Sequence, residues 1–111
     1  MDSIIVKIKK QINNNPIILY MKGTPERPSC SFSMQAIKIL FACGKRFAYI
    51  NVLEHDDIRR ILPIYSNWPT FPQLWLDKKL IGGCDIITDM YHNGKLEILI
   101  EKVFNKYSSL N

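Results

Sequence analysis

The residue best suited to do chemistry in this sequence is a cysteine, Cys30. It lies between two serines in a polar segment that contains Pro28, immediately before an apolar pattern of helical spacing. Free N–H groups and the positive end of the helix dipole stabilise a thiolate at a helix N-terminus, and Lys22 in the preceding loop would add positive charge. A free cysteine is often a small buried hydrophobic residue instead. The exposed, polar surroundings favour a reactive thiolate over that structural role.

The chain has three cysteines, Cys30, Cys43 and Cys84, and none of them forms a close pair. A dithiol oxidoreductase with the C-x-x-C spacing would carry its second thiol at position 33, where Ser33 stands, so a self-contained dithiol cycle is excluded at this motif. Cys43 lies on the apolar face of a predicted helix and is interpreted as core packing. The odd number of cysteines also argues against a secreted disulfide framework, which favours a reducing, intracellular compartment.

A second polar feature follows two glycines, where Gly83, Cys84 and Asp85 begin another predicted helix. Such a helix start offers free N–H donors and a positive dipole to a carboxylate, while Asp85 can accept a hydrogen bond from a cation. Alternatively, Asp85 only caps its helix, and helix capping and ligand binding are compatible roles.

The histidines and tryptophans suggest no further site. His55 and His92 have no metal-ligand spacing to a cysteine or to each other, so a zinc site is not expected, and both are interpreted as surface residues near helix ends. Trp68 adjoins a proline-rich loop and Trp75 lies in a predicted strand, where packing explains both better than stacking on nucleic-acid bases.

The helices and strands that must position these residues can be predicted from the spacing of apolar residues and from the loop residues between them. Helices are predicted where apolar residues recur at three and four positions, and strands where short apolar runs lie between loop residues. The expected order is a helix after a Ser3 cap that ends at residues 13–16, a strand over 17–21, a helix from Cys30 to Gly44, a strand over 47–52, a helix over 56–65, a hairpin of 73–76 and 79–81 around Asp77-Lys78, and helices over 85–91 and 95–106. This order predicts a parallel strand pair followed by an antiparallel pair in one mixed sheet, with helices on its faces, which is the thioredoxin-like layout of an α/β protein.

Length and composition limit the function classes. A chain of 111 residues with 47% hydrophobic residues predicts one domain over residues 1–111. The N-terminus lacks the apolar stretch of a signal peptide, and the longest apolar runs are far shorter than the roughly 20 residues that span a bilayer, so a cytoplasmic protein without membrane association is expected. Although the net charge is +5, the basic residues are scattered along the chain and repeatedly interrupted by acidic ones, which argues against nucleic acid as a partner.

Four segments of the sequence resemble the monothiol glutaredoxins of the C-G-F-S type, and in particular the bacterial single-domain proteins of that family. The resemblance covers about residues 3–107, with one departure, because Ser31 stands where the family has glycine. The segments are Tyr20-Met21-Lys22-Gly23, Pro28-Ser29-Cys30-Ser31-Phe32-Ser33, Trp68-Pro69-Thr70-Phe71-Pro72-Gln73 and Gly82-Gly83-Cys84-Asp85.

The resemblance implies a glutathione site. Lys22 and Arg59 match the residues that bind the glycine carboxylate, although each alone would be interpreted as a solvated surface cation. The segment Thr70-Phe71-Pro72 resembles a loop whose second proline is cis, which leaves the main chain of Phe71 free to pair with the tripeptide. The family's γ-glutamyl carboxylate site corresponds to Gly83, Cys84 and Asp85.

The implied function is iron–sulfur cluster assembly, storage and transfer. Two chains would each give the Cys30 thiolate and two glutathione molecules would give two more, which completes four ligands around a [2Fe-2S] cluster in a homodimer. The partners implied are BolA-like proteins and apo iron–sulfur acceptors.

Two alternatives are open. The first is a glutathione-dependent thiol–disulfide oxidoreductase, in which Cys30 attacks a mixed disulfide and glutathione or Cys84 resolves the intermediate; the missing thiol at position 33 predicts at most weak enzyme activity. The second is a thioredoxin-like binding module without redox chemistry, which does not explain why Cys30 and the glutathione-matching residues occur together. Cluster binding is expected to survive the presence of Ser31, since serine is small.

Overall fold

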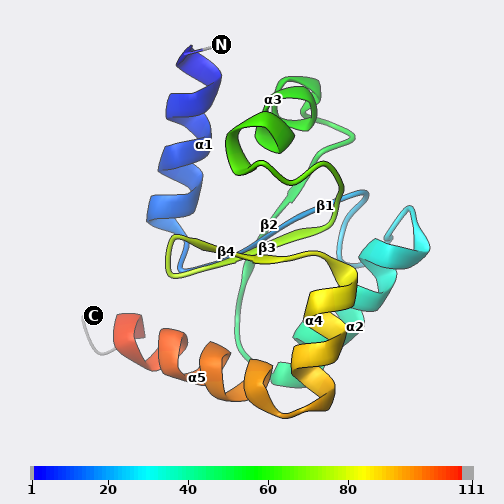
Figure 1. The fold of residues 1–111 in the computed structure, drawn as a ribbon, viewed down its shortest axis with the longest axis vertical. Helices are drawn as coiled ribbons and strands as arrows, with labels where there is room; N and C mark the ends of the chain where they lie inside the picture. Colours follow the sequence, from blue (N-terminus) through cyan, green and yellow to red (C-terminus); the bar gives the residue numbers. More distant parts are fainter. Residues whose placement is uncertain (1, 109–111) are drawn as a thin grey trace.

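The computed structural model describes residues 2–108 of the chain, and its centre is a four-stranded sheet in the order β2-β1-β3-β4. Strand β1 pairs with β2 in parallel and with β3 in antiparallel orientation, and β3 pairs with β4 in antiparallel orientation (Figure 1). The elements along the chain are α1 (Asp2–Asn14), β1 (Ile17–Met21), α2 (Ser31–Cys43), β2 (Ala48–Asn51), α3 (Asp56–Ser66), β3 (Gln73–Leu76), β4 (Lys79–Gly82), α4 (Cys84–His92) and α5 (Lys95–Ser108). The predicted mixed sheet of the thioredoxin-like fold is confirmed.

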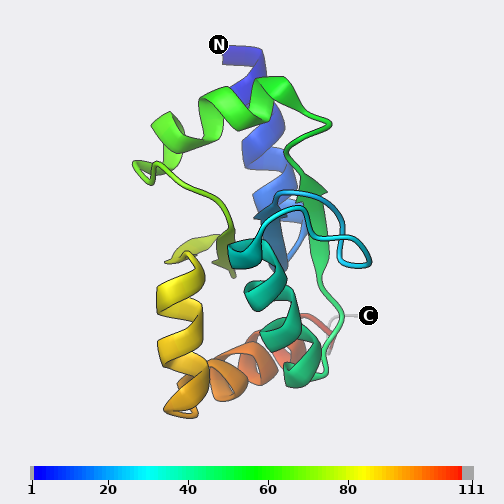
Figure 2. The ribbon, with the colours of Figure 1, turned by 90° about the vertical axis from the view of Figure 1, so that its right-hand side faces the viewer.

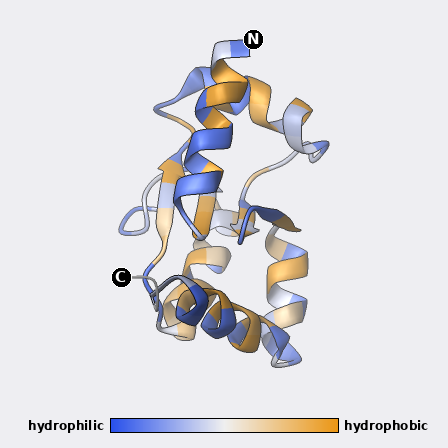
Figure 3. Ribbon diagram, turned by 90° about the vertical axis from the view of Figure 1, so that its left-hand side faces the viewer, coloured by the Kyte–Doolittle hydropathy of each residue, from blue (hydrophilic) through white to orange (hydrophobic). Residues whose placement is uncertain are grey.

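Two hydrophobic clusters lie on opposite faces of the sheet, and the alternating side chains of β1 contribute to both. Ile17, Leu19 and Met21 pack with α2, α4 and α5, whereas Ile18 and Tyr20 pack with α1 and α3. All five residues of β1 are buried, which is the continuous apolar run expected of a central strand. Figure 2 shows α1 and α3 gathered at one end of the molecule and α2, α4 and α5 at the other. Figure 3 shows hydrophobic and hydrophilic residues alternating along α1, as its helical pattern requires.

Several predicted boundaries need correction. Helix α1 already includes Ser3, so Ser3 does not cap it. Strand β2 is shorter than the predicted 47–52, and α3 continues to Ser66, one residue beyond its predicted end, with Pro63 in its last turn. Helix α4 begins at Cys84 and ends at His92, one residue outside the prediction at each end. Helix α5 continues two residues past its predicted end at Lys106.

The hairpin turn between β3 and β4 forms without glycine. Asp77 and Lys78 both adopt positive φ angles, 49° and 69°, which is the backbone of the tight hairpin turns that match strand twist. The Asp77 carboxylate accepts hydrogen bonds from the hydroxyl of Tyr107 and from Lys106 Nζ at 2.9 Å, and the Asp77 N–H donates to the carbonyl of Pro16 at 2.8 Å. These contacts join the turn to α5 and to the start of β1.

A closed loop joins β1 to α2 and delivers Cys30 to the helix start. At its base the N–H of Ser29 donates to the carbonyl of Lys22 at 2.9 Å, and the N–H of Gly23 donates to the side-chain oxygen of Asn51 at 2.9 Å. Its tip contains the exposed residues Glu26 and Arg27. Because the base is held by hydrogen bonds on both sides, the position of Cys30 is fixed by β1 and β2 together.

No helix within residues 2–108 is long and apolar enough to cross a lipid bilayer.

Candidate functional site

Cys30 is the N-cap residue of α2, as its position in the sequence predicts. Its backbone is extended, with φ −148° and ψ 157°, and its Sγ accepts a hydrogen bond from the N–H of Ser33 at 3.4 Å. A sulfur atom in this position takes the place of the oxygen of an ordinary N-cap residue such as serine or aspartate. The thiolate therefore satisfies one of the free donors at the helix start.

The hydroxyl of Ser33 is the other partner of the Cys30 sulfur. Ser33 is fully buried, and its Oγ lies 3.3 Å from Cys30 Sγ. The same Oγ accepts a hydrogen bond from the N–H of Lys22 at 3.1 Å, so its own proton is free to point at the sulfur once the thiol ionises. From the sequence, Ser33 is expected in an exposed polar turn together with Pro28, Ser29 and Ser31, as well as in the place of a second thiol. The expected exposure is wrong for Ser33, because its side chain is fully buried and contacts the main chain of Lys22.

The balance of local effects lowers the pKa of the Cys30 thiol. Partial burial opposes ionisation, but the hydrogen bonds from the hydroxyl and N–H of Ser33, the charge of Lys22 and the N–H of Phe32 outweigh it. In contrast, burial is the main cause that raises the pKa of Cys43 and of Cys84. Cys30 is therefore the thiol most available as a thiolate, which is the form that attacks disulfides and binds metals.

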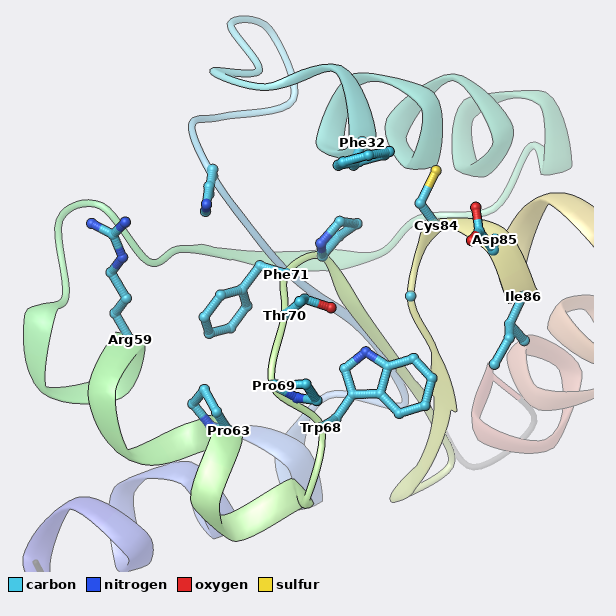
Figure 4. Close-up of a pocket in the computed structure, with 13 residues that line it drawn as sticks. Phe32, Arg59, Pro63, Trp68, Pro69, Thr70, Phe71, Cys84, Asp85 and Ile86 are labelled. Carbon is cyan, nitrogen blue, oxygen red and sulfur yellow. The ribbon is translucent and has the colours of Figure 1, made fainter.

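An open pocket of about 760 Å³ lies beside this helix start. Figure 4 shows Arg59 at one end of the pocket and Cys84 with Asp85 at the other, with Thr70 and Phe71 between them and Phe32 above. Cys30 itself does not line the pocket, but Phe32, two residues further along the chain, does. Every other predicted site residue lines it: Lys22, Arg59, Thr70, Phe71, Pro72, Gly83, Cys84 and Asp85.

The cationic side of the pocket is formed by Lys22 and Arg59. Neither side chain forms an ion pair with any other part of residues 2–108. The next residue along α3, Arg60, instead forms an exposed salt bridge with Asp56 at 3.1 Å. These two cations have no carboxylate partner within residues 2–108 and both line one pocket, so they provide a site for a carboxylate, which the planar group of arginine can bind through two hydrogen bonds.

The floor of the pocket is a loop of residues 68–72, which we call the proline loop. The peptide bond between Phe71 and Pro72 is cis, as the resemblance predicts. Within residues 2–108 the main chain of Phe71 makes no hydrogen bond, so both its N–H and its carbonyl are available to an extended peptide.

The third side of the pocket is the N-terminus of α4. Gly83 is its N-cap, and a side chain there would lie 3.2 Å from the carbonyl oxygen of Pro72 and 3.3 Å from Trp68 Nε1, so a larger residue would fit only if these neighbours shifted by a few tenths of an ångström. Asp85 lies in the first turn of α4, and its side chain makes no capping hydrogen bond within the described chain. Trp68 Nε1 is buried here without a hydrogen-bond partner among residues 2–108. The sequence argument interpreted Trp68 as packing only and did not foresee that its indole N–H lies beside this site.

The remaining candidates lie where the sequence analysis expected them. His55 precedes α3 as its N-cap, His92 is the last residue of α4, and Cys43 packs against the core beside α5. The described part of the chain contains no group of three or more metal-binding side chains close enough to hold an ion.

Comparisons with known proteins agree with this geometry. The family model for glutaredoxin matches residues 17–81. A glutaredoxin 4 of Buchnera aphidicola from Acyrthosiphon pisum is 62% identical over 107 residues, which cover 96% of this chain and 99% of that protein.

Two solved structures share the fold. Reduced apo GrxS14 of poplar superposes with a TM-score of 0.77 at 38% identity, covering 90% of this chain and 92% of the poplar chain. A buckwheat glutaredoxin–glutathione complex superposes with a TM-score of 0.76 at 24% identity, covering 90% of both chains.

Proposed function

Because this chain belongs to the glutaredoxin family, we propose that it binds glutathione in the pocket beside Cys30 and uses that glutathione to carry a [2Fe-2S] cluster between two copies of itself. The observation that carries the proposal is the arrangement of one pocket between a pair of cations and a helix N-terminus, next to a thiol whose pKa is lowered. The domain over residues 1–111 would act as a single unit in this role.

The pocket complements the groups of glutathione one by one. Lys22 and Arg59 would bind the glycine carboxylate, and the free main chain of Phe71 would pair with the central residue as an added strand does. The N–H groups at the start of α4, at Cys84 and Asp85, would bind the γ-glutamyl carboxylate, and the Asp85 carboxylate would accept from the ammonium group. The buckwheat structure with the same fold is a glutaredoxin–glutathione complex, and the roles of the individual residues here are our proposal.

Cluster binding follows from the number of thiolates. A [2Fe-2S] cluster takes four sulfur ligands, and one chain offers one readily ionised thiol, Cys30. Two chains and two bound glutathione molecules complete the set, with one proton released from each thiol that ligates iron. Because two of the ligands are diffusible, the cluster is cargo to be transferred, and BolA-like proteins and apo iron–sulfur proteins are the recipients we propose. All three cysteines are free thiols, which supports a reducing compartment such as the cytoplasm.

Glutathione binding is tested by calorimetry on the wild-type protein and on two neighbouring variants. Arg59→Met removes a charge-assisted contact and should weaken affinity by about tenfold or more, since hydrogen bonds to charged groups contribute about 1.5–3 kcal/mol. Arg60→Met removes an equal charge from the same helix but from a residue paired with Asp56, so its affinity should stay within about twofold of wild type. Equal losses in both variants would contradict the assigned site.

Cluster binding is tested by anaerobic reconstitution with iron, sulfide and glutathione, followed by visible absorption and gel filtration. We expect a coloured dimer that requires glutathione and is lost in Cys30→Ser. A colourless monomer from the wild-type chain would refute the carrier function while leaving glutathione binding intact.

The lowered pKa of Cys30 also supports a second candidate, removal of glutathione from mixed disulfides. The Cys30 thiolate would attack the glutathione sulfur and release the protein thiolate, which leaves a Cys30–glutathione disulfide; a second glutathione thiolate would then release oxidised glutathione and restore Cys30. Burial is the main cause that raises the pKa of Cys84, which lowers the fraction of that residue present as thiolate, so we propose free glutathione as the attacking group in the second step. Rapid turnover of a glutathione mixed disulfide by a chain that binds no cluster would favour this activity over cluster transfer.

A further inference from the structure

The buried side chain of Gln73 joins the proline loop to the sheet. Gln73 is the first residue of β3 and is fully buried. Its Nε2 donates to the carbonyl of Trp68 at 2.9 Å and to the carbonyl of Thr70 at 3.3 Å, and its Oε1 accepts from Trp75 Nε1 at 3.3 Å. One carboxamide therefore uses both of its donors on the loop and its acceptor on the strand. We propose that Gln73 is the positioning residue that holds the proline loop in the conformation that binds glutathione.

The loop has few other means of holding its shape. Prolines at positions 69 and 72 have no N–H to donate, and the main chain of Phe71 makes no hydrogen bond within the described chain. Thr70 and Phe71 must nevertheless face the pocket in a defined geometry if an extended peptide is to pair with them. The two hydrogen bonds from Gln73 hold the carbonyls of Trp68 and Thr70, so they fix the part of the loop that precedes the cis peptide bond.

The orientation of the carboxamide is fixed by Trp75. With the amide reversed, the NH₂ group would face the indole N–H of Trp75, two donors would meet, and the loop carbonyls would face an oxygen. Trp75 is itself held by burial in the core and by stacking on Tyr65, with ring centroids 6.3 Å apart. The aromatic pair thereby determines which end of Gln73 meets the loop.

The inference rests on the proposed glutathione site for its effect on affinity, but not for its effect on the loop. Without the two donors, the loop would have to be ordered when the ligand binds, and that ordering reduces affinity. We expect Gln73→Met, which keeps the volume and removes the donors, to weaken glutathione binding by about tenfold.

The experiment measures glutathione affinity by calorimetry, the order parameters of the Thr70 and Phe71 amides by NMR relaxation, and stability by urea unfolding. The control is Val103→Ala, a truncation of a buried residue of α5 that lowers stability away from the pocket. In Gln73→Met the two order parameters should fall from about 0.85 towards values below about 0.6, while in Val103→Ala both they and the affinity should stay at wild-type levels. Trp75→Phe, which leaves the donors in place, should show a smaller loss of affinity than Gln73→Met.

Retention of rigid order parameters in Gln73→Met would overturn the inference, whatever its affinity. A wild-type chain that fails to bind glutathione would refute the proposed function, and the order parameters would still decide the role of Gln73. If Gln73→Met does not fold, Gln73→Leu removes the same donors in a smaller side chain and is judged by the same two measurements.

Discussion

Replacement of Ser33 by alanine should raise the pKa of the Cys30 thiol and slow its reactions near neutral pH. The substitution removes the hydroxyl that lies 3.3 Å from the sulfur but leaves the N–H of residue 33 in place as a donor. A sequence comparison with dithiol proteins would treat position 33 only as a lost thiol. The structure instead predicts that the serine hydroxyl contributes directly to ionisation of its neighbour.

The magnitude follows from the hydrogen bond that is lost. A hydrogen bond to a charged group contributes about 1.5–3 kcal/mol, and the partial exposure of Cys30 reduces this to about 1–1.5 kcal/mol. The ratio of thiolate to thiol should therefore fall by about five- to thirteenfold at a given pH. Stability should also decrease by about 1 kcal/mol, because the part-buried N–H of Lys22 loses its acceptor.

The assay is the rate of alkylation by iodoacetamide from about pH 5 to 9, read for each cysteine-containing peptide by mass spectrometry. Cys43 serves as the internal reference, since the charge of Cys30 affects the pKa of Cys84 but not that of Cys43. Ser31→Ala is the matched control, since it removes an exposed hydroxyl next to Cys30 that makes no hydrogen bond within residues 2–108. An alkylation profile for Cys30 that is the same in Ser33→Ala as in wild type, with the fold intact by circular dichroism, would refute the reasoning.

Three further predictions concern other parts of the fold. Gly23 and Gly44 both have positive φ, but a side chain at Gly23 would lie 2.4 Å from a loop carbonyl, whereas the space at Gly44 is open. Alanine at Gly23 should therefore lower the free energy of unfolding in urea by about 1–3 kcal/mol more than alanine at Gly44. Hydrogen bonds, chiefly from Tyr107, lower the pKa of Asp77 in the folded protein. Asp77→Asn should therefore be less stable than wild type at neutral pH. The difference in stability should disappear as the pH falls below about 4 and through the lowered pKa. Peptide mapping after brief alkylation near pH 7 should label Cys30 before Cys84, and the reverse order would contradict their opposite pKa shifts.

The sheet and its helices could be predicted from the sequence because each element follows a local rule. The five-residue apolar run of β1 can only be buried, and the helical spacing after Cys30 determines where α2 begins. The errors lie at element ends, where tertiary contacts decide. The hairpin turn at Asp77 and Lys78, in contrast, is predicted from its flanking strands and confirmed, although no glycine indicates its positive φ angles, and hydrogen bonds from α5 to Asp77 stabilise it.

The site was predictable to the extent that its residues belong to recognisable motifs. The eight pocket residues named from the sequence do line one pocket, whereas their roles in binding remain predictions. The buried partners could not be predicted, because Ser33 and Gln73 act through contacts to main-chain atoms that a motif does not reveal. Trp68 belongs to the same class, since only the fold shows that its indole N–H is buried beside Gly83 without a partner in the described residues.

The loop between β1 and α2 can change in length without moving the reactive cysteine. Its base is closed by the bond between Ser29 and Lys22, while its tip at Glu26 and Arg27 is exposed to solvent. Lengthening a loop at an exposed tip adds little to the entropy of closing it. The main chains of Thr24 and Arg27 exchange hydrogen bonds at 3.2 and 3.0 Å, so the place for an insertion is next to Glu26, between these two residues. An insertion there should leave Cys30 in position, and Glu26 is also the place to attach a fluorescent reporter that senses binding at the site.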